Sequence, residues 1–286
     1  MTDIHELEKR AMCGDKEAAV KEYRMNNLSR EYSLNCFYDE LKLVVAEGDL
    51  ILTELGTTDS LPIVLLSPKE RLPQKPSILV AAGFHGDEPA GVWGVLKFIR
   101  DHYLYFRDSI NIHFLPLVNP TGFFQQSRTN YKGQDPNRGF CHTKSGIPEV
   151  SDEGSILLGF KDQLLKFGEH GFISLHEDFE EERYYLYTFE KSTGPGPLSE
   201  ALRMTEETFF EPLPDGDLDG GYVKNGVIYQ QCDGSFEDYL FHQGSSRTTC
   251  TETPGLLDLK LRVRVNALLV KTLAELVGRN WREGNE

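Results

Sequence analysis

The sequence predicts a single α/β domain with a mixed, mostly parallel central sheet flanked by helices. Three observations support this fold class. Strand-like apolar runs alternate with helical patterns along the chain, no internal repeat or clean linker interrupts them, and residues 77–83 ("SILVAAG") form a continuous apolar run. Such a run is typical of a central strand covered on both faces, and strand–helix alternation favours a parallel sheet.

The first half of the chain begins with an amphipathic pattern at residues 3–25, which predicts a helix with one apolar face. Strand-like runs follow at 42–48, 49–56 and 62–68, before the central strand at 77–83. Residues 89–106 are predicted as a helix, because Pro89 lies in the first turn, where a missing N–H is tolerated. We expect residues 1–45 to be a helical extension packed on a main domain at 46–286.

The second half continues the alternation. We expect a strand at 109–120 and a long ordered loop at 119–153, which is rich in Gly, Pro, Asn and Ser; loops of this length are usually functional. The remaining elements are predicted as a helix at 156–168, strands at 171–178 and 184–189, a helix at 198–210, a strand at 248–255 and a helix at 258–281.

Composition excludes several classes of protein. The formal net charge of −15 disfavours a nucleic-acid-binding surface. No apolar run approaches the roughly 20 residues of a membrane helix, and the charged N-terminus lacks a secretory signal. The five cysteines are scattered without a C-x-x-C motif, which predicts free thiols in a reducing compartment. We therefore expect a cytoplasmic protein that binds neither nucleic acid nor membranes.

Polar residues follow the ends of the predicted apolar strands. His85 and Glu88, three positions apart, come after the central strand, and His176 ends another strand. Glu252 lies within the last strand. Since ligands of open α/β sheets collect at the carboxyl edge of the strands, we expect these four side chains to converge.

Two histidines and one carboxylate form a catalytic zinc set with one position open for water or substrate. Zinc lowers the pKa of water and polarises a carbonyl. A carboxylate outside the metal shell is needed to move the proton, and Glu252 fits this role. Arginines would stabilise an oxyanion and bind a substrate carboxylate; the long loop offers Arg128 and Arg138.

These residues stand in motifs that resemble those of the zinc metallocarboxypeptidases of the carboxypeptidase A/B type. The motifs are "HGDE", an Arg followed nine positions later by "NR", a strand-terminal "LH" and a late "TETP" strand. The segment "YQQCDGSFEDYLFHQGSSRTTCTE" is similar to the substrate-pocket segment of that family. The resemblance covers residues 50–280 and implies a zinc carboxypeptidase-like catalytic domain.

The resemblance implies a role for each matching residue. His85, Glu88 and His176 would bind one zinc ion, and Glu252 would be the general base and acid. Arg128 would polarise the scissile carbonyl. The terminal carboxylate of the substrate would be held by Asn137 and Arg138, with Tyr229 closing over it. Glu237 falls where the family places the floor of the specificity pocket, which implies a preference for C-terminal Lys or Arg.

Other functions remain open at this stage. The 87 residues between Glu88 and His176 are fewer than in the digestive enzymes and closer to the deacylase branch, which resembles aspartoacylase and succinylglutamate desuccinylase. The substrate is therefore expected to be a peptide or an acyl amino acid. An amidase of cell-wall peptides and a catalytically silent binding protein are further alternatives. The oligomeric state is not indicated.

Each motif also has an ordinary structural interpretation. The His85–Glu88 pair on its own is compatible with a solvated turn, and His176 with a strand-end histidine. Glu177 and Asp178 could orient His176 or help to hold a second metal ion, although we expect one ion. Cys250 could line the pocket or be a small core residue.

Overall fold

A computed structural model of the protein describes residues 30–141, 143, 146, 148–191, 196–229 and 231–283. The helix predicted at residues 3–25 lies outside this part. Within it, none of the helices has the length and the apolar character needed to cross a membrane.

The described residues form a mixed eight-stranded sheet in the order β1-β2-β4-β3-β5-β10-β6-β9, together with a β7-β8 hairpin. Strands β4, β3, β5 and β10 are mutually parallel at its centre, and β1, β2 and β6 introduce antiparallel pairs. The strands are β1 (Leu50–Thr58), β2 (Leu61–Pro68), β3 (Ser77–Ala82), β4 (Asn111–Leu115), β5 (Gly171–Asp178), β6 (Tyr185–Glu190), β7 (Gly216–Leu218), β8 (Gly221–Val223), β9 (Val227–Tyr229) and β10 (Arg247–Pro254).

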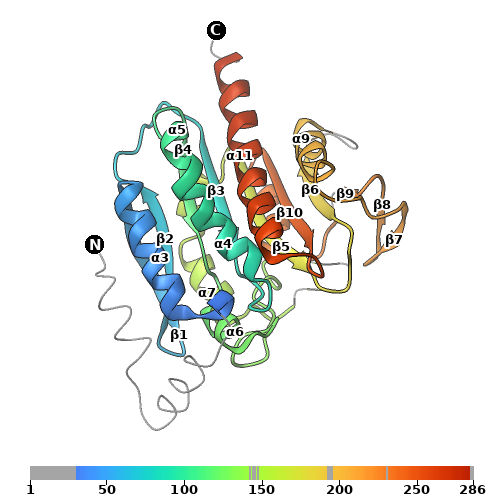
Figure 1. Ribbon diagram of the computed structural model, residues 1–286, viewed down its shortest axis with the longest axis horizontal. Coiled ribbons are helices and arrows are strands. Elements are labelled where there is room, and N and C mark those ends of the chain that lie inside the picture. Colours follow the sequence, from blue (N-terminus) through green and yellow to red (C-terminus); the bar gives the residue numbers. More distant parts are fainter. Residues whose placement is uncertain are drawn as a thin grey trace.

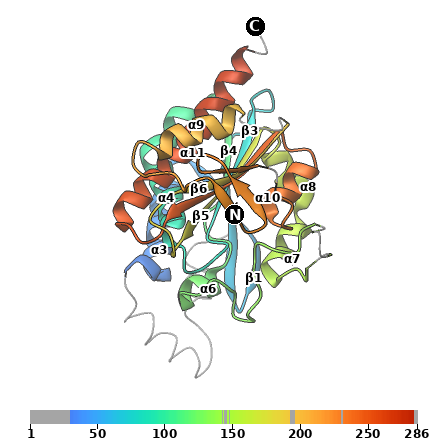
Figure 2. The ribbon, with the colours of Figure 1, turned by 90° about the vertical axis from the view of Figure 1, so that its right-hand side faces the viewer.

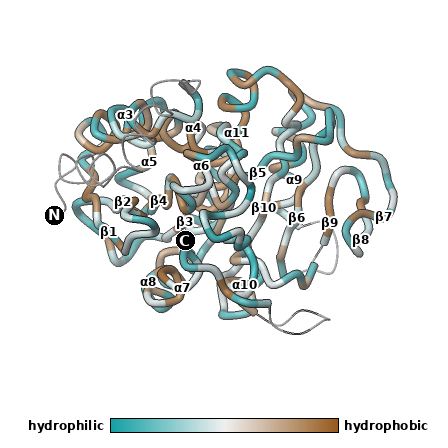
Figure 3. The backbone as a smooth tube through the Cα atoms, turned by 90° about the horizontal axis from the view of Figure 1, so that it is seen from below, coloured by the Kyte–Doolittle hydropathy of each residue, from teal (hydrophilic) through white to brown (hydrophobic). Residues whose placement is uncertain are grey.

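Helices cover both faces of this sheet (Figures 1, 2 and 3). One face carries α3 (Leu34–Glu47), α4 (Pro89–Phe98), α9 (Pro197–Glu206) and the long α11 (Leu259–Glu283). The other carries α7 (Asp152–Gly159), α8 (Lys161–Phe167) and α10 (Phe236–His242). Shorter elements are the 3₁₀ turn η1 (Arg30–Tyr32), the π-helical turn η2 (Ile99–Tyr103), α5 (Leu104–Phe106) and α6 (Pro120–Gln125). The predicted fold class is confirmed.

The central strand β3 is buried on both faces, as the sequence predicts. Alternate side chains belong to different cores: Val80 packs in the core beneath α4 and α11, whereas Leu79 packs in the core beneath α8. This alternation follows from the two-residue period of a strand. It explains why a strand at this place has to be apolar at every position.

The strand predicted at residues 42–48 is wrong, because this segment belongs to helix α3. Ser33 caps the helix by accepting a hydrogen bond from the backbone N–H of Cys36 at 3.3 Å. Leu34, Leu41 and Val44 then face the core at helical spacing. The two adjacent valines suggest a strand locally, but burial of this apolar stripe decides the conformation. The described part of the predicted extension therefore shares the main core.

Four further segments differ from the expectation. The helix predicted at 156–168 is two helices, α7 and α8, which meet at Phe160. The loop at 119–153 contains α6, and α7 begins within it. The short strands β7 to β9 are not predicted, because three-residue strands carry no measurable periodicity. Helix α10, which has seven residues, is not predicted either.

Strand register brings the polar residues together. β10 pairs with β5 so that Glu252 lies directly beside His176, and Cys250 lies beside Ser174. β3 pairs with β5 so that Ala82 lies beside Leu175, one residue before His176. The chain after β3 therefore emerges at the same edge of the sheet as His176.

Two glycines allow the close packing around this edge. A Cβ atom on Gly86 would lie 1.8 Å from the backbone carbon of Gly122, so only glycine fits where the loop after β3 crosses α6. A Cβ atom on Gly91 would lie 2.6 Å from the carbonyl oxygen of Leu175, so α4 can approach β5 only with glycine there. Gly86 therefore has a steric reason to separate His85 from Glu88.

Candidate metal centre and active site

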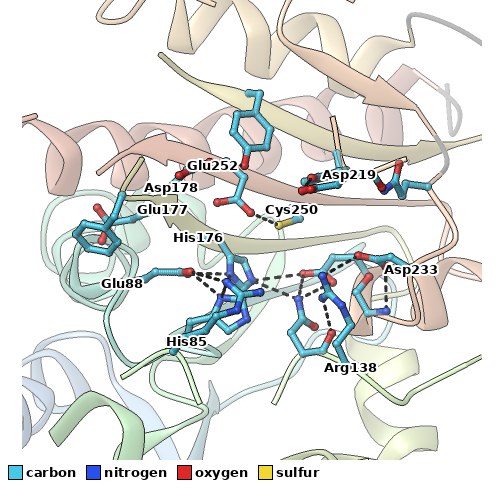
Figure 4. A pocket seen from close by; sticks show the side chains of 18 of the residues that line it. His85, Glu88, Arg138, His176, Glu177, Asp178, Asp219, Asp233, Cys250 and Glu252 are labelled. Atoms are coloured by element: carbon cyan, nitrogen blue, oxygen red, sulfur yellow. Dashed lines mark hydrogen bonds and ion pairs between the residues drawn. The ribbon is translucent and has the colours of Figure 1, made fainter. Parts of the chain in front are cut away.

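Three predicted ligands meet in one buried cluster at the carboxyl edge of the sheet (Figure 4). His85 lies in the loop after β3, Glu88 is the N-cap residue of α4, and His176 lies near the end of β5. His85 Nδ1 is 2.6 Å from Glu88 Oε1, and His176 Nδ1 is 2.8 Å from Glu88 Oε2. The two Nδ1 atoms are 3.1 Å apart.

The residues present fit a metal ion. The donor atoms of the three residues, one from each, all lie within 4.8 Å of one another, and each oxygen of Glu88 lies beside an imidazole Nδ1. Burial opposes ionisation of Glu88, but His85 and His176 beside it lower its pKa to about 2. An ionised carboxylate and two imidazoles in such a small buried volume are a typical zinc ligand set.

Outer residues orient both histidines so that their Nδ1 atoms face inward. His85 Nε2 lies 3.3 Å from Asp135 Oδ1, and His176 Nε2 lies 3.8 Å from Glu237 Oε1. At His85 the carboxylate is within hydrogen-bond distance of the outer ring nitrogen, which fixes the tautomer that leaves the inner nitrogen free to bind metal. Although burial acts in the opposite direction, His85 and Arg128 hold the pKa of Asp135 below its usual range.

Asp135 is a site residue that the sequence analysis missed. Its signal is the "DPNR" turn, in which Asp135 Oδ1 also accepts a hydrogen bond from the backbone N–H of Asn137 at 2.9 Å. In turns, an Asp side chain commonly accepts a hydrogen bond from the backbone N–H two residues further along the chain. Only the contact with His85 distinguishes Asp135 from an ordinary turn residue.

Glu252 lies beside the metal cluster without belonging to the His85–Glu88–His176 group. Burial raises the pKa of its carboxyl group to about 8, with His176 and Arg128 acting in the opposite direction and Glu88 and Asp178 adding to the rise. The Cys250 thiol lies 3.6 Å from Glu252 Oε1 and also lines the pocket. A carboxyl group with a raised pKa next to a metal site suits proton transfer.

The two predicted arginines both line the pocket. Arg128 Nη1 lies 3.7 Å from Glu88 Oε1, and its Nη2 lies 3.3 Å from Asp135 Oδ2. Arg138 Nη2 lies 3.4 Å from Asp233 Oδ2. Half of the Arg128 side chain and a third of the Arg138 side chain are exposed, so both guanidinium groups can meet a substrate.

Asn137 and Glu237 form a buried pair on the pocket wall. Asn137 Nδ2 donates to Glu237 Oε2 at 3.2 Å, and Asn137 Oδ1 accepts from the backbone N–H of Phe236 at 3.0 Å. Glu237 also accepts a hydrogen bond from the hydroxyl of Ser174. Both side chains line the pocket, but these contacts hold them to β5 and α10.

The structure does not bring Tyr229 to the pocket. Tyr229 ends β9 and packs against the core beneath α9, with its hydroxyl directed to Ser199. Two tyrosines of β6 line the pocket instead. Tyr185 donates to Asp178 Oδ2 at 2.8 Å, and Tyr187 donates to Asp219 Oδ2 at 3.2 Å.

Tyr185 and Tyr187 were missed because nothing in "YYLYTF" marks the inward positions. β6 pairs with β10 so that Tyr185 lies beside Glu252 and Tyr187 beside Cys250. Burial and the charge of Glu252 raise the pKa of both phenols far above the usual value, so both remain hydrogen-bond donors.

Glu177, next to His176, anchors the helix that carries Glu88. Its Oε2 accepts a hydrogen bond from the backbone N–H of Ala90 at 2.6 Å, and its Oε1 pairs with Arg262 of α11. A carboxylate at a helix N-terminus is favourable because it meets unpaired N–H groups and the positive end of the dipole. Glu177 therefore anchors the start of α4. It is not a member of the His85–Glu88–His176 ligand group.

The pocket around these residues has a volume of about 350 Å³. Acidic side chains outnumber basic ones among its described lining residues: Asp87, Glu88, Glu177, Asp178, Glu180, Asp219, Asp233, Glu237 and Glu252 face Arg128 and Arg138. The pocket is therefore a concave, mostly anionic site with a metal-ligand cluster at one end.

Fold and site together indicate a metal-dependent hydrolase, and the comparisons with known proteins agree with this class. The structure of a "putative metallopeptidase" from Shewanella amazonensis is 36% identical, with a TM-score of 0.82 over 86% of this chain and 94% of that chain. A protein of the same description from Shewanella denitrificans is 34% identical, with a TM-score of 0.80 over 85% of this chain and 90% of that one. The chain belongs to the same family as these metallopeptidases.

More distant matches share the fold or part of the sequence. The catalytic-domain family of succinylglutamate desuccinylase and aspartoacylase matches residues 74–170. A metallo-carboxypeptidase from Burkholderia cenocepacia shares the fold, with 17% identity and a TM-score of 0.63 over 87% of this chain and 69% of that chain. Carboxypeptidase E of Caenorhabditis elegans is 28% identical over 130 residues, which cover 36% of this chain and only 28% of that protein.

Proposed function

We propose that the protein is a zinc-dependent carboxypeptidase that hydrolyses the C-terminal bond of peptides, with a preference for C-terminal Lys or Arg. One observation carries this proposal. The His85–Glu88–His176 cluster lies beside a carboxyl group, that of Glu252, in a pocket that also contains two partly exposed arginines. These are the groups that hydrolysis of a peptide with a free carboxylate requires.

Each side chain has a definite task in this reaction. Zinc held by the three ligands would lower the pKa of water and polarise the carbonyl group. Glu252 accepts the proton of the attacking water and later delivers it to the leaving amine nitrogen. Arg128, at the edge of the ligand cluster, donates hydrogen bonds to the oxyanion that develops on the former carbonyl oxygen.

Recognition of the terminal carboxylate falls to Arg138 in this proposal. Its guanidinium lies on the pocket wall opposite the metal ligands and is held by Asp233 and by the carbonyl oxygen of Asn137. A guanidinium in a fixed orientation binds a carboxylate bidentately. Asn137 supports this wall through its bonds with Glu237 and Phe236.

The preference for a cationic last residue rests on the charge of the lining. Asp219 and Asp233 lie on the side of the pocket away from the metal ligands (Figure 4). A lysine or arginine side chain placed there would gain ion pairs, whereas an acidic one would be repelled. The exposed and half-buried free thiols suit a reducing compartment, so we place this activity in the cytosol.

Hydrolysis of peptides that differ only in their last residue tests this function. Purified protein with one equivalent of zinc at the cluster should release Lys and Arg faster than Phe, and Glu slowest. Amidated versions of the same peptides should react poorly. Absence of release from all four free peptides, with zinc bound, would contradict the proposal.

An N-acyl amino acid deacylase is the second candidate, because the succinylglutamate desuccinylase and aspartoacylase catalytic domain matches residues 74–170. This segment contains two of the ligands and both arginines, and the same metal and base would serve. Incubation with acetyl-aspartate and succinyl-glutamate separates the two functions. Faster turnover of these small molecules than of any peptide would favour the deacylase.

A further inference from the structure

A second group of metal-binding side chains lies at α10, apart from the catalytic pocket. It consists of Cys232, just before the helix, and of Asp238 and His242 within it. Cys141, from the segment that follows Arg138, reaches the same place. These four residues, which we call the α10 cluster, have no role in the proposed reaction.

The donor atoms of the α10 cluster are close enough to share an ion. Those of Cys232, Asp238 and His242 all lie within 4.8 Å of one another. His242 Nδ1 is 2.8 Å from Asp238 Oδ1, and the thiol of Cys141 is 3.3 Å from Asp238 Oδ2. Zinc bonds of about 2.0–2.3 Å place ligands at similar separations, roughly 3–4 Å apart.

Asp238 is the centre of the cluster and is itself buried. Its side chain is 1% exposed, and its buried Oδ1 contacts only His242 Nδ1 among the described residues, which directs its hydrogen bond to the backbone oxygen of Asp238 at 2.9 Å. An ordinary i,i+4 pair of Asp238 with His242 would explain one contact of this carboxylate. It does not explain why Cys232, six residues earlier, and Cys141, from a distant segment, approach the same group. Sulfur, nitrogen and oxygen donors around one buried carboxylate suit zinc.

We propose that Cys232, Asp238 and His242, with Cys141 as the fourth ligand, form a second, structural binding site for a divalent metal ion of the zinc type. Both thiols bind as thiolates, and their protons are released to solvent on binding. This inference does not depend on the reaction catalysed at the other site.

Such an ion would fix one wall of the catalytic pocket. The backbone N–H of Phe140 donates to Gly234 O at 3.0 Å, and the backbone N–H of Gly234 donates to Asp238 Oδ2 at 3.1 Å. Arg138, two residues before Phe140, pairs with Asp233, one residue before Gly234. The ion therefore would join the segment that carries Arg138 to the one that carries Asp233 and Glu237.

Metal analysis of the full-length protein, purified under reducing conditions, tests the site. We expect two zinc equivalents in the wild type and one in the variant Cys232→Ser/His242→Ala. The variant His85→Ala/His176→Ala should also keep one, held by the α10 cluster. A wild type with a single equivalent that is lost in the His85→Ala/His176→Ala variant would overturn the proposal.

Cobalt substitution gives a second measurement, and its first readout needs only the wild-type protein. Co²⁺ bound by thiolate produces a near-ultraviolet charge-transfer absorption, which the His85–Glu88–His176 set cannot give. We expect this absorption in the wild type, a weaker absorption in Cys232→Ser and its loss in Cys141→Ser/Cys232→Ser. Cys36→Ser and Cys250→Ser, which change thiols outside the cluster, should keep it. No such absorption in the Co²⁺-loaded wild type, or its loss in Cys250→Ser instead, would contradict the assignment.

Discussion

Glu237 Oε1 lies 3.8 Å from His176 Nε2, on the side of the imidazole away from the metal cluster. The sequence alone suggests Glu237 as the floor of a specificity pocket, whereas this contact makes it an orienting group for a metal ligand. The two roles have different consequences for a variant. Glu237 thus provides a test of how the pocket is built.

We expect Glu237→Gln to weaken zinc binding about 10- to 100-fold, because an outer carboxylate fixes the tautomer of a metal-binding histidine. Competition with a chelator measures this affinity. Asp219→Asn, farther from the ligands, is the matched control and should leave zinc affinity unchanged while reducing the preference for Lys and Arg. If Glu237→Gln changes only substrate preference, the contact with His176 does not contribute to zinc affinity.

Glu252→Gln should lower kcat by about 10²- to 10⁴-fold, because the amide cannot move the proton of water. The variant should keep zinc, since Glu252 lies outside the ligand set. Metal analysis and steady-state kinetics check both statements. Glu180→Gln, an exposed acid of the same pocket, should retain activity. Loss of metal from Glu252→Gln would show that Glu252 is a ligand.

Arg138→Ala should raise KM for peptides with a free C-terminus roughly 10- to 150-fold, which corresponds to the loss of a charged hydrogen bond of about 1.5–3 kcal/mol. The same substitution should hardly affect amidated peptides, which lack the carboxylate. Comparing each free peptide with its amide in both enzymes gives the answer. An equal loss on both kinds of substrate would indicate a structural role.

Arg262→Met should destabilise the protein by about 3–5 kcal/mol, because Glu177 would be left as a buried charge without its partner. The expected result is a lower midpoint in urea and weaker zinc binding, since Glu177 also holds the start of α4. The control is Arg264→Met. Arg264 is exposed and lies two residues further along α11, so this variant should hardly change the free energy of unfolding. A neutral Arg262→Met would mean that the ion pair contributes little to the anchor.

His113 gives a pH dependence that lies far from the metal site. Burial lowers its pKa from about 6.5 to about 3, with Arg71 adding to the effect; it stacks on Phe167 at 3.5 Å between ring centroids. Between these pH values the unfolded chain binds more protons, so stability falls as the pH is lowered through the window, by up to about 1.4 kcal/mol per pH unit.

Urea unfolding at pH 7 and pH 5 measures this effect. His113→Gln should be less stable at pH 7, because it loses the stacking, but should lose less stability on acidification than the wild type. The relevant quantity is the change in the free energy of unfolding between pH 7 and pH 5, compared between the two proteins. The contribution of the carboxylates is common to both proteins and cancels in this comparison. Equal changes would show that His113 is protonated without penalty in the folded state.

The buried strands and the ligand motifs could be predicted because their signals are local. β3 has to be apolar at each position when helices cover both faces, and His85, Glu88 and His176 directly follow or end such strands. Helix α3 could not be predicted in this way. Its adjacent valines favour a strand, and only the core that receives Leu41 and Val44 selects the helix.

The outer residues of the site depend on contacts between distant segments. The local patterns around Asp135 and Tyr185 indicate only an ordinary turn and an ordinary strand. Their roles come from the contact with His85 and from the register of β6 on β10. Tyr229 shows the converse. Its motif resembles that of a substrate-binding tyrosine, but β9 places it against Ser199 and the core.

The sequence by itself determined the fold class, the family and the residue types of the metal cluster, because apolar periodicity and closely spaced donors are properties of short segments. Tertiary structure alone decided which carboxylates support which histidine, which tyrosines line the pocket, and that two cysteines approach Asp238. Those relationships depend on the pairing of strands and the packing of helices, which bring together atoms up to about a hundred residues apart.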